Sequence, residues 1–125
     1  MNQEIPVDSR NTVLDLGGRF HLNFGHVKTM LDLCTKNLRI LYLDRMDLDA
    51  LPLGLFRLEF LEELHVQGNK LSALPDDIGL INGLRVLNCA RNRLTKLPDS
   101  ISLLTDLESI DFVRASLRIF VNCAI

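Results

Sequence analysis

Residues 61–83 read LEELHVQGNKLSALPDDIGLING, and residues 84–106 read LRVLNCARNRLTKLPDSISLLTD. The two stretches share residues at the same spaced positions: each begins with Leu, has Asn in ninth place and continues to Leu-Pro-Asp. Residues 38–60 before them and 107–125 after them keep the same 23-residue spacing, although the last stretch is incomplete. Because recurrence at a fixed period of about 20 to 50 residues is the signature of stacked supersecondary units, the sequence predicts a repeat architecture.

Each repeat opens with a short segment in which apolar and polar residues alternate. These segments contain LYL, LHV, LNC and IDF, and such alternation is typical of a half-buried strand. The fourth position of successive repeats carries Leu41, Leu64, Leu87 and Ile110 without a gap. One unit cannot cover its own apolar face, so we expect the units to stack as rungs, about 4.8 Å apart, with these residues in a continuous core.

The pattern LxxLxLxxNxLxxLPxxIxxLxx resembles the leucine-rich repeat family. It is most similar to the 23-residue class found in Ras-group, Scribble-like and plant intracellular repeat proteins and in some bacterial effectors. The resemblance implies an α/β fold: a right-handed solenoid of about five rungs, with a curved parallel sheet on the concave side. Short helices or turns would form the convex side, and Pro52, Pro75 and Pro98 suit the first turn of such helices.

The spacing predicts one repeat domain over residues 11–125, preceded by a lead or partial cap at residues 1–10. Its rungs are residues 11–37, 38–60, 61–83, 84–106 and 107–125. The first rung diverges, and HVKTMLDLCTKN at residues 26–37 has the apolar spacing of a longer convex helix. The last rung stops in mid-repeat without a polar cap. It pairs with another copy, belongs to a longer repeat array, or frays, and the sequence does not rank these three.

The ninth-position asparagine of the family pattern normally satisfies backbone groups in the turn. Asn69 and Asn92 occupy this position, whereas Met46 and Ala115 replace it in the flanking rungs. Buried backbone groups need hydrogen-bond partners. We therefore expect the turns to be best ordered in the middle of the solenoid.

The outward-facing strand residues and the turns that follow them predict a binding surface, because solenoids use their concave face in this way. In the predicted register Tyr42, His65 and Asn88 are direct neighbours, and basic residues gather toward the C-terminal half. Such a surface suits an acidic segment of a partner. The predicted contact residues are Tyr42, Arg45, His65, Gln67, Asn88, Arg91, Arg93, Asp111 and Arg114.

Catalytic and metal chemistry are not expected. His65 and Asp111 share a column but lie two rungs apart, roughly 9–10 Å, with Asn88 between them. The three cysteines are odd in number and form no CxxC pair, so we expect free thiols, no metal site and no cofactor. A nucleophilic triad would need a serine or cysteine beside a histidine and an aspartate in contact, and a zinc site would need cysteines and histidines grouped together.

The formal net charge of −2 indicates neither nucleic acid nor an anionic membrane as a partner. No segment reads as a signal peptide or a membrane span, so we expect a cytoplasmic protein. The predicted function is a non-enzymatic protein-interaction module, an intracellular scaffold or regulator. The resemblance implies another protein as partner, with a small GTPase, a phosphatase, or the host target of a translocated bacterial effector left open. A second hypothesis is a homodimer that forms through apolar residues of the uncapped last rung: Phe112, Phe120, Val121 and Ile125.

Overall fold

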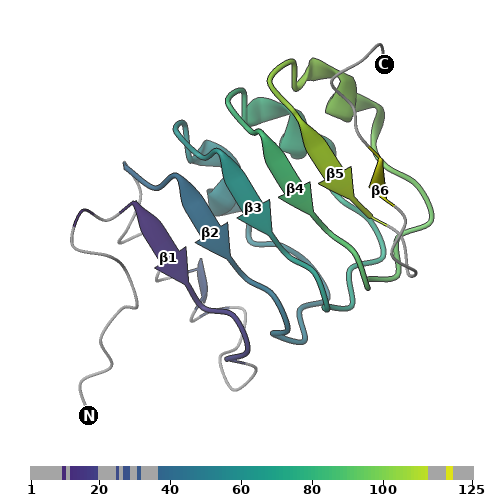
Figure 1. The fold of residues 1–125 in the computed structure, drawn as a ribbon. Coiled ribbons are helices and arrows are strands. Elements are labelled where there is room, and N and C mark those ends of the chain that lie inside the picture. Colours follow the sequence, from purple (N-terminus) through teal and green to yellow (C-terminus); the bar gives the residue numbers. More distant parts are fainter. Residues whose placement is uncertain are drawn as a thin grey trace.

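The structure is a computed structural model that describes residues 10, 12–19, 25, 27–28, 31, 37–112 and 118–119. Five three-residue strands lie side by side and parallel in chain order (Figure 1). They are β1 (Val13–Asp15), β2 (Ile40–Tyr42), β3 (Glu63–His65), β4 (Val86–Asn88) and β5 (Ser109–Asp111). A two-residue strand, β6 (Arg118–Ile119), pairs with β5. Within the described residues, no helix is long and apolar enough to span a membrane.

From β2 to β5 the strands pair in the register that the 23-residue period predicts, and β1 pairs with β2 across a longer first rung. Leu14 pairs with Leu41, Leu41 with Leu64, Leu64 with Leu87, and Leu87 with Ile110. These five side chains are at most 1% exposed, so they form the continuous core behind the sheet. Backbone hydrogen bonds repeat with the same period, as when Leu43 N–H donates to the carbonyl of His65 and Val66 N–H to that of Asn88. The predicted solenoid is confirmed.

Short 3₁₀ helices return the chain on the other side of the sheet (Figure 1). They are η1 (Leu53–Arg57), η2 (Asp76–Leu80) and η3 (Asp99–Leu103). The three repeat prolines lie one residue before these helices, in extended conformation, rather than inside the first turn. Proline at this point lacks only an N–H that the helix would not use. The apolar residues of η2 and η3 and of the positions just after them, Ile78, Ile81, Ile101 and Leu104, are all buried in the core.

The first rung is described only in part. Gly25, Val27, Lys28 and Leu31 are helical, and Val27 and Leu31 are buried in the core. These residues agree with the predicted convex helix. Asn37, the last residue of the predicted helix, is described but lies in a bend rather than in a helix. The other residues of that helix and the predicted N-terminal lead, except Arg10, lie outside the described residues.

The last rung departs from the repeat. The repeat pattern gives no indication of β6, which runs antiparallel to β5 and pairs Ile110 with Ile119 and Asp111 with Arg118. Only six residues, 112–117, join the two strands. A parallel crossover needs about a dozen residues, whereas an antiparallel return needs only a short connection. The outer edge of β5 is thus paired within the chain. The apolar residues Leu117, Phe120, Val121 and Ile125 of the last rung lie outside the described residues.

Candidate functional site

The residues that flank each buried strand leucine lie on the opposite, concave face of the sheet. One column on this face contains Tyr42, His65, Asn88 and Asp111, paired in register on adjacent strands. All four are half-buried, as is expected for side chains that lie on an open sheet. The structure therefore brings together these predicted contact residues, and their use in binding stays a prediction.

Two rings of this column form a stacked pair. The ring centroids of Tyr42 and His65 are 4.7 Å apart, with 14° between the ring planes. The imidazole Nε2 of His65 also lies 3.0 Å from Oε1 of Glu63, on the same strand. Residues two apart on a strand share a face, so this carboxylate could have been found from the sequence. The stack and the hydrogen bond hold the imidazole in one orientation.

A line of turn residues follows the strands and borders the concave face. The eighth position of successive rungs contains Gly18, Arg45, Gly68 and Arg91, and all four have left-handed backbone with φ between 54° and 75°. Glycine adopts this conformation freely, whereas a residue with a Cβ is disfavoured in it. The two arginines therefore occupy positions that the local backbone would favour for glycine.

Arg45 makes contacts that help to hold it there. Its Nε donates to Oδ2 of Asp44 at 2.9 Å, and Asp44 is only 8% exposed. A Cβ added to Gly68 would lie 3.1 Å from Cγ of Arg45, so the arginine stem crosses the space that this glycine leaves open. Lys70 is also paired, with its Nζ 2.7 Å from Oδ1 of Asp47.

Arg91 and Arg93 differ from Arg45 and Lys70 in having no carboxylate partner among the described residues. Both are exposed, and no carboxylate of the described residues lies within 4.0 Å of either guanidinium. They flank Asn92, which is buried. Two of the basic residues predicted for the C-terminal half are therefore exposed and have no carboxylate partner among the described residues, while Arg114 lies outside them.

The ninth-position asparagines hold the turns, as predicted. Oδ1 of Asn69 accepts hydrogen bonds from the N–H groups of Met46 and Leu48, at 2.9 and 3.0 Å. Its Nδ2 donates to the carbonyls of Leu43 and Val66, both at 2.8 Å. Asn92 repeats the arrangement one rung later: it accepts from Leu71 and donates to carbonyls that include those of Val66 and Cys89. The turn that carries the basic pair is thus fixed from inside.

A ladder of alternating charges, which we did not predict, runs along the strand entrances. Arg39 bonds Glu62 at 2.7 Å, and Arg85 lies between Glu62 and Glu108, at 3.7 and 2.8 Å. The hydrogen bond from Arg39 is the main cause that lowers the pKa of Glu62. The four residues occupy the second position of successive rungs, so the alternation was readable from the sequence. They form ion pairs with one another across the rungs.

The groups considered for chemistry are not brought together. Asn88 lies in register between His65 and Asp111, as predicted, so the imidazole does not pair with that carboxylate. Cys89 is a free, fully buried thiol, and burial, with a smaller contribution from the charge of Asp111, raises its pKa to about 12. Oε1 of Gln67 is buried without a hydrogen-bond partner among the described groups. Gln67 itself is half-buried and follows β3.

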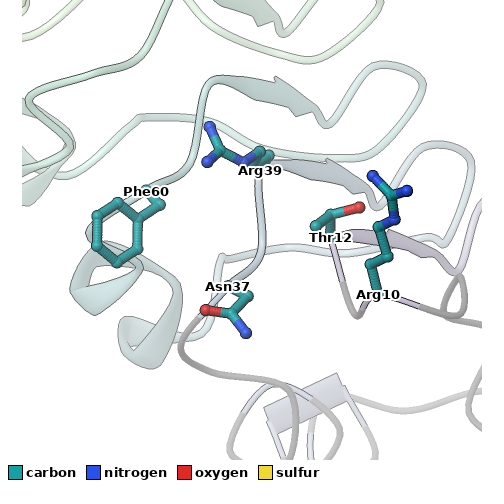
Figure 2. Close-up of a pocket in the computed structure, with 5 residues that line it drawn as sticks. All are labelled: Arg10, Thr12, Asn37, Arg39 and Phe60. Carbon is teal, nitrogen blue, oxygen red and sulfur yellow. The ribbon is translucent and has the colours of Figure 1, made fainter.

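A recess of about 240 Å³ lies away from the predicted contact residues. Its lining comes from Arg10, Thr12, Asn37, Arg39 and Phe60 (Figure 2). Phe60 and Arg10 stand on opposite sides of it in this view, and the guanidinium of Arg39 is already bound to Glu62. The recess does not gather charged groups around one point. The concave face with its bordering turns is the stronger candidate.

Comparison with known proteins agrees with this geometry. The family model described as a leucine-rich repeat region matches residues 11–122. Among solved structures, a leucine-rich repeat protein of Leptospira interrogans is similar to this chain, with a TM-score of 0.60 and 32% sequence identity. The match covers 67% of this chain but only 22% of that protein. The chain therefore spans much less than two thirds of the length of that protein. A search of curated proteins found no match.

Proposed function

The chain belongs to the leucine-rich repeat family, and from this premise we propose that it is a non-enzymatic protein-binding module that uses the concave face of its sheet. The observation that supports this proposal best is the column of Tyr42, His65, Asn88 and Asp111. It offers two stacked rings, an amide and a carboxylate on one preorganised surface. Aromatic residues such as tyrosine are enriched where proteins contact one another.

Rigidity is the second support. The strands are tied by a periodic backbone ladder, and the turns are tied by Asn69 and Asn92. A surface that is already ordered loses little conformational entropy when a partner binds. The proposed mechanism is therefore presentation of fixed side chains to a loop, helix or tail of another protein.

We further propose a scaffolding or regulatory role inside a cell, with a small GTPase or a phosphatase as the class of partner. The support is the 23-residue repeat, which resembles that of intracellular repeat proteins. A second candidate is a bacterial effector that acts on host proteins. It is favoured by the bacterial source of the similar solved structure.

An affinity-capture experiment with matched variants tests the concave face. Wild type, Tyr42→Ala/His65→Ala and the convex control Leu80→Ser/Leu103→Ser are compared in extracts of the cells that make the protein. Leu80 and Leu103 are each 63% exposed on the convex side, so the control removes apolar surface without opening the core. We expect one set of captured proteins to persist in the control and to be lost from the concave variant. Equal capture by all three would contradict the proposal.

A further inference from the structure

The turn that follows β4 holds two arginines whose charges are not matched within the described residues. Arg45 and Arg91 share the same left-handed backbone, with φ of 54° and 55°. Arg45 has an internal reason to be there, because it is bound to Asp44. Arg91 has no such carboxylate, although its backbone is disfavoured in the same way. An exposed guanidinium without a carboxylate of its own is free to bind one from another molecule.

The neighbouring groups strengthen this comparison. Lys70, in the preceding turn, is matched by Asp47, whereas Arg93 is not matched by any described carboxylate. Asn92 lies between Arg91 and Arg93, and its buried amide binds backbone groups on either side. The two exposed guanidinium groups are therefore carried by a turn that is anchored from within.

From these observations we propose that Arg91 and Arg93 bind carboxylates of an acidic segment in the protein partner. This inference rests on the proposed protein-binding function and specifies the chemistry of the partner. Guanidinium groups present a planar fork of donors that matches a carboxylate, and such charge-assisted hydrogen bonds are stronger than neutral ones. The segment would pass along the turns that border the concave face, on the side of β4.

The test uses the full chain and a fluorescein-labelled hexaglutamate peptide, with hexaglutamine as the neutral control, in fluorescence anisotropy at low salt. The test variant is Arg91→Gly/Arg93→Gln, since glycine keeps the left-handed backbone that residue 91 requires. Arg57→Gln is the charge control: Arg57 is exposed and lies in η1 on the convex side. A phosphoserine peptide of the same length separates phosphate from carboxylate recognition.

We expect wild type to bind hexaglutamate, to bind it less tightly as salt is added, and to ignore hexaglutamine. The test variant should bind roughly tenfold more weakly, which corresponds to about 1.4 kcal/mol. Arg57→Gln should bind within about twofold of wild type, because Arg57 lies on the convex side, away from the turn that holds Arg91 and Arg93. The single variant Arg91→Gly should unfold at the same urea concentration as wild type or a higher one, because it relieves the left-handed backbone.

Three results would overturn this assignment. They are unchanged hexaglutamate binding by the test variant, an equal loss in Arg57→Gln, and tight binding of the phosphoserine peptide alone. A lower unfolding midpoint for Arg91→Gly would show that Arg91 has a stabilising role inside the protein. Affinity capture by the Tyr42→Ala/His65→Ala variant is independent of these outcomes. Loss of capture there, together with unchanged peptide binding here, would leave the concave face in place and remove only the acidic segment.

Discussion

Replacing Asn69 by Ala should remove the strongest single tie between two turns of the solenoid. The amide bonds the N–H groups of Met46 and Leu48 and the carbonyls of Leu43 and Val66, all as buried contacts. Alanine leaves Met46 N–H, Leu48 N–H and the Leu43 carbonyl without this partner, whereas the Val66 carbonyl keeps its hydrogen bond from Asn92. A buried polar group that loses its hydrogen bond costs about 1–3 kcal/mol.

Three such groups give a formal range of about 3–9 kcal/mol, and relaxation of the turn will keep the loss in the lower half of this range. We expect Asn69→Ala to lower the free energy of unfolding by about 4 kcal/mol, a large part of the ~5–15 kcal/mol typical of a domain. The measurement is equilibrium urea unfolding followed by circular dichroism. The slope of the free energy against urea concentration checks that wild type and variant unfold to the same extent.

Two further variants sharpen this experiment. Asn82→Ala is the matched control. Asn82 is exposed, so this substitution should change the free energy of unfolding by no more than about 0.5 kcal/mol. Asn69→Asp keeps an acceptor for Met46 and Leu48 but loses the amide donors to the two carbonyls. It should be less destabilised at acid pH, where the protonated carboxyl can donate one bond. A loss below about 1 kcal/mol for Asn69→Ala, or one equal to that of Asn82→Ala, would refute the reasoning.

Three other predictions concern the convex side, the buried thiol and the last rung. A Cβ at Gly79 would lie 2.9 Å from both Cβ and the carbonyl oxygen of Ser100. Gly79→Ala should therefore lower the free energy of unfolding by about 1–3 kcal/mol in the same assay. An unchanged free energy of unfolding would show that η2 and η3 separate easily. The pKa of Cys89 is raised from 9.0 to about 12, so the unfolded chain loses this proton first as pH rises and stability falls above pH 9. Relative to Cys89→Val, wild type should lose up to about 1.4 kcal/mol per pH unit between pH 9 and 11, and parallel pH profiles would contradict this. Because β6 pairs with the edge of β5, sedimentation velocity should show a monomer at every concentration; a dimer weakened by Phe120→Lys would instead support self-association through the last rung.

Much of this fold could be predicted because a 23-residue period fixes which residues stack. Leu41, Leu64 and Leu87 were placed on top of one another from spacing alone, and the strand register confirms it. The same register placed Tyr42 beside His65. It could not give the ring geometry, since that depends on side-chain torsions and on the hydrogen bond to Glu63.

The features that sequence reasoning missed depend on contacts that cross the repeat unit or on its end. The ladder from Arg39 to Glu108 needed a comparison of second positions across rungs. The left-handed backbone of Arg91 could not be read from the sequence, because the eighth position carries arginine in some rungs and glycine, Gly18 and Gly68, in others. Strand β6 runs antiparallel because only a short connection joins it to β5. The repeat pattern ends before this connection, so it could not predict the strand.

The most direct test of the central claim is photo-crosslinking from single positions on the two faces. Benzoylphenylalanine replaces Tyr42 on the concave sheet in one variant and the exposed Leu80 on the convex side in another. After irradiation in the cells that make the protein, adducts are identified by mass spectrometry. The concave-face account predicts a defined protein adduct from position 42 that position 80 does not form. The same adduct from both positions, or adducts from position 80 alone, would contradict it.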